Sequence, residues 1–245
     1  MRNVLLKSPP RGLGRLRIFR RNMGPWTIYL PTDRWKPHLP PDVILLQGFA
    51  TGPRAMTPLC RALEARGLVC AVPRLRRRSG YLQLGTVRFA GRELASFLHS
   101  LPEGTRPWII GHSIGGVIAR QAIQLEGAAS RVRGLITMGS PHRGTPAAIA
   151  GLAIGLGILS PTPFNMVPLA PTILRMNRAP WPSDIPLLSI VSWSDLLCPP
   201  PFGSLPFADG ERIRTHSVSG HGHTDLLRSS EVESVIAETI ESYKP

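Results

Sequence analysis

The stretch "RPWIIGHSIGGVIARQAIQL", residues 106–125, decides how the rest of the chain is interpreted. Its apolar run at 108–110 predicts a buried strand, and the apolar residues at 117–125 predict a helix. Between them lies G-x-S-x-G, which is typical of a sharp strand-to-helix turn that exposes the hydroxyl of Ser113 above a sheet. The sequence therefore predicts a nucleophilic serine at a helix N-terminus, where backbone amides favour negative charge.

The remainder of the chain predicts an α/β sheet. Apolar runs typical of strands buried on both faces occur at 42–48, 67–73, 108–111, 132–141, 186–195 and 213–220. Apolar residues at helical spacing occur at 57–65, 87–98 and 117–125, and a capping box of Ser230 and Glu233 predicts a last helix at 231–242. This alternation predicts a mostly parallel, doubly wound sheet of about six strands flanked by helices.

The chain has 245 residues and a formal net charge of +14. The distribution of the basic residues divides it into two parts. Residues 1–41 form a basic arm rich in Arg and Pro, with seven Lys and Arg residues before the first acid, Asp33. Residues 42–245 form the α/β domain. The positive charge would attract an anionic membrane or an acidic partner, although an excess made almost entirely of Arg also fits a compositional bias.

Cysteine usage and hydropathy bear on the compartment. Cys60, Cys70 and Cys198 fit neither a metal site nor a disulfide framework, and the first two lie in apolar stretches typical of a core. The N-terminus lacks the continuous apolar segment of a signal peptide. The uncharged stretch at 144–174 has an apolar run of 13 residues, fewer than the ~20 that span a bilayer. We expect a cytoplasmic protein whose basic arm contacts anionic membranes.

A serine nucleophile needs a base and an acid that orients the base. In this architecture they follow in the order Ser, Asp, His. Asp195 ends a predicted strand, and His221 and His223 follow the next one, so Asp195 would hold one of these imidazoles against Ser113. Asp184 and Asp209 are alternative acids, whereas Asp225 lies so near the histidines that a role in their turn is favoured.

Acyl transfer also needs donors for an oxyanion. One is expected from the amide after the nucleophile, which belongs to Ile114. The other is expected from the loop after the first strand of the domain, where Gly48 lets the chain turn and Phe49 supplies the amide.

Five segments together resemble lipases and esterases of the α/β-hydrolase fold, especially bacterial triacylglycerol-lipase-like members. They are "VILLQGFATG", "IIGHSIGGVIAR", "ITMGSPHRGTP", "SIVSWSDLLCPP" and "GHGHTDLL", and the resemblance runs from about residue 43 to 227. It implies a carboxylic ester hydrolase that needs no metal or cofactor.

The resemblance also assigns roles to individual residues. The nucleophile falls on Ser113, the acid on Asp195, and the oxyanion donors on Phe49 and Ile114. The base falls on His223 rather than His221, because a short polar step and a leucine pair follow it. The sequence departs from the family where these enzymes usually have His-Gly, since Gln47 precedes Gly48 here. The side chain at position 47 helps to fix the loop that supplies an oxyanion donor, so this difference bears most on the geometry of the oxyanion hole.

The mostly uncharged segment at about 146–182 lies where such lipases carry a lid, and a permanently packed helical cap is the alternative. Its apolar character favours lipid-like esters as substrates. Two other functions remain open. An acyltransferase would use the same acyl-enzyme with an alcohol in place of water, and a non-catalytic membrane adaptor would use the basic arm. Nucleic-acid binding is not predicted, because the basic runs lack interleaved aromatic residues. The sequence does not predict an oligomeric state.

Overall fold

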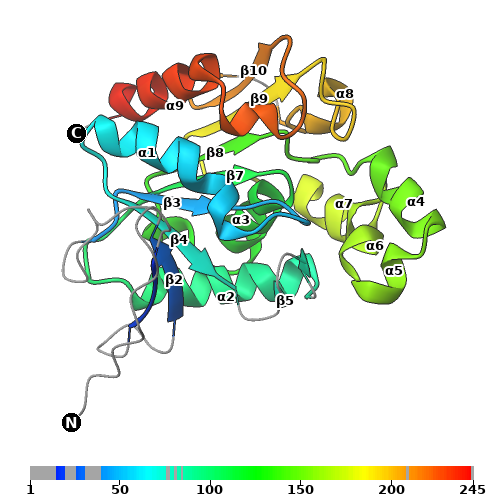
Figure 1. Cartoon of the computed structure of the whole chain (residues 1–245), viewed down its shortest axis with the longest axis horizontal. Coiled ribbons are helices and arrows are strands. Elements are labelled where there is room, and N and C mark those ends of the chain that lie inside the picture. The colour runs from blue at the N-terminus through cyan, green and yellow to red at the C-terminus, as the bar shows by residue number, and fades with distance from the viewer. Residues whose placement is uncertain are drawn as a thin grey trace.

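The computed structural model describes residues 40–75, 85–207 and 210–243 in full, together with the backbone of short strands at 15–19, 26–30, 78–79 and 82–83. Its central feature is a twisted sheet with the strand order β1-β2-β4-β3-β7-β8-β9-β10 (Figure 1). Six strands are parallel: β3 (Val43–Leu46), β4 (Cys70–Arg74), β7 (Trp108–His112), β8 (Gly134–Met138), β9 (Leu187–Ser192) and β10 (Ile213–Val218). The predicted mostly parallel sheet of about six strands is confirmed.

Two further strands extend this sheet at one edge. β1 (Arg15–Phe19) and β2 (Trp26–Leu30) pair antiparallel with each other, and β2 pairs antiparallel with β4. Both lie in the segment that the sequence analysis set apart as an arm. Their short apolar stretches, RLRIF and WTIYL, stand between arginines and prolines that obscured a strand pattern. A separate small hairpin joins β5 (Arg78–Ser79) to β6 (Leu82–Gln83).

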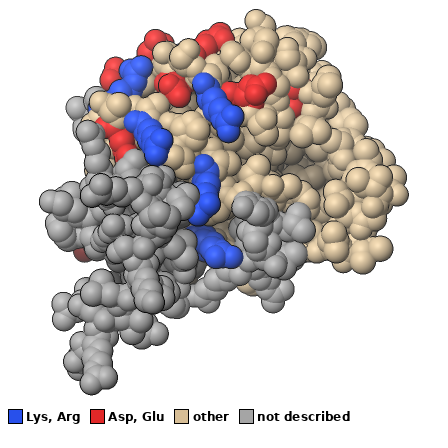
Figure 2. Space-filling view, in the orientation of Figure 1, with Lys and Arg blue, Asp and Glu red and all other residues tan. Residues whose placement is uncertain are grey.

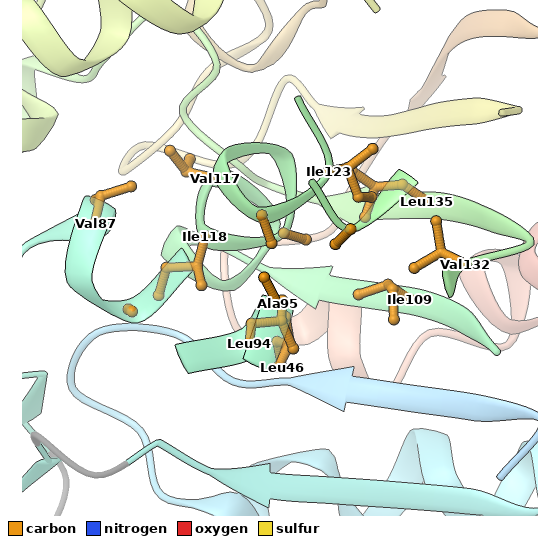
Figure 3. Close-up of a cluster of buried hydrophobic side chains, with 14 of the residues drawn as sticks. Leu46, Val87, Leu94, Ala95, Ile109, Val117, Ile118, Ile123, Val132 and Leu135 are labelled. Atoms are coloured by element: carbon orange, nitrogen blue, oxygen red, sulfur yellow. The ribbon is translucent and has the colours of Figure 1, made fainter. Parts of the chain in front are cut away.

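Helices cover both faces of the sheet, as runs of apolar strands require. The first core face is covered by α2 (Val87–Ser100) and α3 (Ile114–Leu125), and the second by α1 (Thr57–Ala65) and α9 (Ser230–Ser242). Figure 3 shows the first core, where Val117 and Ile118 of α3 lie among residues of α2 and the strands. Short turns of helix complete the chain at α8 (Pro200–Gly203), η1 (Pro53–Met56), η2 (Ala129–Arg131) and η3 (Asp225–Leu227).

The start of α9 corrects one detail of the sequence analysis. The N-cap residue is Ser229, whose hydroxyl accepts a hydrogen bond from the Val232 amide at 3.2 Å. Ser230 is already the first helical residue. Both residues are serines, and the capping preference alone does not distinguish neighbours of the same type.

The mostly uncharged segment at 146–182 forms four short helices, which we call the cap. They are α4 (Pro146–Ala153), α5 (Leu156–Leu159), α6 (Thr162–Met166) and α7 (Pro171–Arg178). Prolines and glycines keep them short, because Pro ends a helix or occupies its first turn. In Figure 1 the cap forms a lobe on the side toward which β3 points, so it stands beside the carboxyl ends of the parallel strands.

Candidate active site

Ser113 occupies the sharp turn between β7 and α3, with φ 55° and ψ −128°. A positive φ is strained for a residue with a side chain, and such strain costs on the order of 1–3 kcal/mol and gathers at functional sites. The turn needs its glycines for space. A Cβ at Gly111 would lie 2.3 Å from the Gly116 nitrogen, and one at Gly115 would lie 2.4 Å from the Leu46 carbonyl oxygen. The local sequence therefore dictates this turn.

Asp195 and His223 lie together although 28 residues separate them in sequence. The Asp195 side chain is fully buried after β9, and its Oδ2 lies 2.7 Å from Nδ1 of His223. The other carboxylate oxygen accepts hydrogen bonds from the amides of Leu197 at 3.0 Å and Cys198 at 2.8 Å. These donors fix the carboxylate, and the carboxylate in turn fixes the orientation of the His223 ring, leaving Nε2 for another partner.

His221 has different partners, so the structure separates the two histidines. Its Nε2 lies 3.0 Å from Oε2 of Glu231 and 3.0 Å from the hydroxyl of Ser229, both at the start of α9. Asp225 accepts a hydrogen bond from the Gly222 amide at 3.1 Å, as expected of a turn residue. Of the alternative acids, Asp184 lies exposed in the turn before β9, and Asp209 lies outside the described residues.

His112, the residue before Ser113, connects the serine turn to the His223 loop. Its Nε2 donates a hydrogen bond to the carbonyl oxygen of His223 at 2.8 Å, and the two imidazole rings lie 4.7 Å apart. Burial and the neighbouring His223 lower the pKa of His112 to about 4, so its ring is neutral at pH 7.

The loop after β3 reaches the serine. A Cβ at Gly48 would lie 3.1 Å from Nδ1 of His112 and 3.2 Å from Cβ of Ser113. Gln47 is buried, and half-buried Phe49 follows the glycine. Ile114, the first residue of α3, directly follows the serine and is buried. The two segments expected to supply oxyanion donors therefore both lie next to Ser113.

Gly139 is a site residue that sequence analysis missed. It follows β8 with φ 54°, and a Cβ there would lie 2.7 Å from Oδ2 of Asp195 and 3.1 Å from Nδ1 of His223. Only a glycine leaves room for the Asp–His pair at this point. The available signal was a glycine directly after a buried strand, in the segment "ITMGSP".

A buried arginine, also missed, joins α3 to the cap. Arg120 is fully buried, and its guanidinium contacts Oε1 of Gln124 at 3.0 Å, Oδ1 of Asn177 at 3.2 Å and Nδ1 of His142 at 3.3 Å. Its Nη2 also donates to the Met176 carbonyl at 3.4 Å, near the end of α7. Burial lowers the pKa of Arg120 to about 9, so it stays protonated at pH 7.

The fold of the chain is similar to that of solved lipases and esterases. A lipase of Bacillus licheniformis in its mature form superposes with a TM-score of 0.68 at 14% identity, over 88% of this chain and 97% of that one. A monoacylglycerol lipase of Paleococcus ferrophilus gives 0.66 at 15% identity, over 84% and 96%. A naproxen esterase of Bacillus subtilis gives 0.59 at 14% identity, over 92% and 92%. The chain has the α/β-hydrolase fold.

One part of the sequence matches a protein-family model. Residues 86–154, which run from the start of α2 into the cap, match the model of the PGAP1-like alpha/beta domain. This match contains Ser113 and its turn. No curated protein matches the sequence at a significant level. Within the described ranges, no helix combines the length and the apolar character needed to cross a membrane.

Proposed function

We propose that this protein is a carboxylic ester hydrolase that works through an acyl-enzyme on Ser113. The observation that carries the proposal is the buried Asp195–His223 pair, 2.7 Å apart, at the same sheet edge as the strained Ser113 turn. His112 links the two sides through its hydrogen bond to the His223 carbonyl. The likeness to lipases and esterases supports the same reaction class.

In the proposed mechanism, Oγ of Ser113 attacks the ester carbonyl while His223 accepts the hydroxyl proton. Asp195 holds the imidazole in the tautomer that leaves Nε2 free to act as base. The amides of Phe49 and Ile114 stabilise the oxyanion of the tetrahedral intermediate. His223 then gives its proton to the departing alcohol, and afterwards activates the water that releases the acid. Hydrolysis of the acyl-enzyme returns Ser113 to its free hydroxyl form.

We infer that the substrates are lipid-like esters. The cap, which stands beside the carboxyl ends of the strands, is uncharged from residue 144 to residue 174. An apolar surface beside the site favours acyl chains over charged groups. The cap is proposed as the cover of the acyl-chain site.

Labelling by a fluorophosphonate probe tests the reaction class, because the probe reacts with activated serines. We expect the wild type to label and Ser113→Ala not to label. Asp195→Asn and His223→Ala should slow labelling by about 100-fold or more. His221→Ala is the matched control, since it removes an imidazole two residues away and should label at the wild-type rate.

Each variant must first show a wild-type circular dichroism spectrum, so that loss of labelling is not loss of folding. A folded wild type that does not label would overturn the hydrolase proposal. Equal slowing by His221→Ala and His223→Ala would overturn the assignment of the base. Hydrolysis of a series of p-nitrophenyl esters, from acetate to palmitate, then tests the preference for longer acyl chains.

A further inference from the structure

The strongly exposed large apolar side chains of the described residues lie in the cap and in the loop after β9, which meet where the Thr145 hydroxyl donates to the Leu197 carbonyl. Six belong to the cap: Ile149, Ile154, Ile158, Leu159, Phe164 and Leu169. Three more, Trp193, Leu196 and Leu197, lie in the loop that carries Asp195. On the face that Figure 2 shows, the coloured charged residues lie away from the lobe formed by the cap. We call these nine residues the apolar surface.

The composition of α4 and α5 does not match ordinary surface helices. A helix on a protein surface normally has a polar face, and one that is apolar all round is normally buried. α4 has the sequence PAAIAGLA, yet only Ala148 and Gly151 are buried. In and beside α5, Ile154 is 79% exposed and Ile158 is 91% exposed. Such a surface is expected to be covered by something apolar.

Hydrogen bonds hold the cap in the conformation that exposes these residues. Oδ1 of Asn165 in α6 accepts from the Val87 amide at the start of α2 at 3.0 Å, and the Thr162 hydroxyl donates to the Gly85 carbonyl at 3.1 Å. At the other end, Nε2 of Gln124 donates to the Met176 carbonyl at 3.1 Å and to the Ala179 carbonyl at 3.0 Å. The apolar surface is therefore presented without any opening of the cap.

The charges next to the uncharged stretch are all positive. Arg143 precedes it, Arg175 and Arg178 follow it, and all three are exposed. An exposed apolar stretch flanked in sequence by exposed arginines matches the boundary between acyl chains and anionic headgroups. Trp193, which is 68% exposed, is the side-chain type enriched at that depth of a membrane. The net charge of +14 adds attraction to the same target.

We propose that the apolar surface is a fixed docking site for the surface of an anionic phospholipid bilayer. α4 and α5 enter the interface with Ile154 and Ile158, and the flanking arginines meet the headgroups. Because Asp195 begins the loop of Leu196 and Leu197, docking brings the candidate active site to the membrane. This last step rests on the proposed ester hydrolase function, whereas the docking itself does not.

Sedimentation of the full chain with phospholipid vesicles tests the proposal. The probes are vesicles of pure phosphatidylcholine and of phosphatidylcholine with phosphatidylglycerol. We expect binding to both, stronger to the anionic vesicles. Ile154→Asp/Ile158→Asp should weaken binding by about tenfold or more, because two charged groups would replace the side chains that enter the interface.

Two further variants separate hydrophobic contact from charge. Ile154→Ser/Ile158→Ser leaves the net charge unchanged and should still weaken binding severalfold. Ser96→Asp/Ser130→Asp, at exposed positions in α2 and η2, adds the same two charges away from the cap and is the matched control. It should bind more tightly than Ile154→Asp/Ile158→Asp.

Three outcomes would overturn the proposal. Cap variants that bind vesicles like the wild type would do so, and so would wild-type binding that disappears completely at high salt, because a purely ionic contact does not need the apolar surface. A wild type that ignores vesicles but forms dimers, which the cap variants lose, would assign the surface to a second copy of the chain.

Fluorophosphonate labelling without lipid keeps this test separate from the proposed function. Ile154→Asp/Ile158→Asp should label at the wild-type rate, because Ile154 and Ile158 are 79% and 91% exposed and so are not the side chains that would cover the acyl-chain site. If the wild type docks through the cap but never labels, docking stands and the hydrolase proposal fails. If the wild type labels but its binding to vesicles does not depend on the cap, the hydrolase proposal stands and the docking proposal fails.

Discussion

Helices α3 and α4 are built from similar residues and meet opposite surroundings. α3, IGGVIARQAIQL, has ten buried residues, whereas α4, PAAIAGLA, has two. α3 packs against both α2 and the sheet (Figure 3), and it begins directly after the candidate nucleophile. α4 lies in the cap with its isoleucine half exposed. Apolar composition alone thus marks burial in one helix and, in our proposal, membrane contact in the other. The following predictions test this contrast, beginning with the largest effect.

Truncation of a side chain in α3 should be costly. Ile118 is 1% exposed and lies in the core between α2 and the sheet. Ile118→Ala removes buried methyl groups and leaves a cavity, so we expect a loss of about 2–5 kcal/mol in the free energy of unfolding. Urea unfolding followed by circular dichroism measures this loss. A change below 1 kcal/mol would contradict the packing described for α3.

Acid should lower the stability of the folded protein, because His112 at the turn before α3 is buried and neutral. The pKa of His112 is lowered to about 4 in the folded state, from 6.5 in an unfolded chain. Between these values only the unfolded state takes up the proton, so stability is complete above pH 6.5 and falls as the pH drops toward 4. The shift corresponds to about 3 kcal/mol.

Burial and Arg120 likewise lower the pKa of His142, which adds to this loss. Urea unfolding at a series of pH values, comparing the wild type with His112→Gln, measures the contribution of His112. The variant should lose clearly less stability between pH 6.5 and pH 4. Parallel curves for the two proteins would show that His112 is not the buried neutral group described here.

The contact between α3 and the cap should have an intermediate effect. Arg120→Met removes the guanidinium that donates hydrogen bonds to Oδ1 of Asn177 and to the Met176 carbonyl. The Met176 carbonyl keeps its hydrogen bond from Gln124. We expect a loss of about 1–3 kcal/mol, because Nδ1 of the buried His142 and Oδ1 of the half-buried Asn177 lose the guanidinium as their partner. Faster hydrogen exchange of the Ala179 amide, which closes the last turn of α7, would locate the effect.

Arg120→Lys is the matched comparison for that variant. Lysine keeps a positive charge but does not reproduce the planar fork that spans several acceptors. We expect it to remain destabilised. If Arg120→Lys is as stable as the wild type, the charge matters more than the hydrogen-bond geometry described above.

Truncation in α4 should have the smallest effect. Ile149 is 54% exposed, so Ile149→Ala should change the free energy of unfolding by no more than about 0.5 kcal/mol. The measurement is the same urea unfolding used for Ile118→Ala. A loss comparable to that of Ile118→Ala would mean that α4 is held by packing, and the contrast between the two helices would disappear.

Features fixed by local sequence were predicted well. The six parallel strands, the helices between them and the turn at Ser113 follow from apolar runs, helical spacing and glycines at fixed offsets. These signals are local, because sterics and periodicity act over a few residues. β1 and β2 were not predicted, since short strands among arginines and prolines become recognisable only through their pairing with β4.

Features that depend on distant residues needed the tertiary structure. Spacing left His221 and His223 as alternatives, and only the folded chain brings His223 to Asp195 and His221 to Glu231. The place of Gly139 against this pair and the burial of Arg120 also come from contacts across the fold. The sequence by itself predicts the fold and the sharp turn at Ser113, because both depend on residues that are neighbours in the chain. Partner choice and exposure depend on how the sheet brings remote loops together.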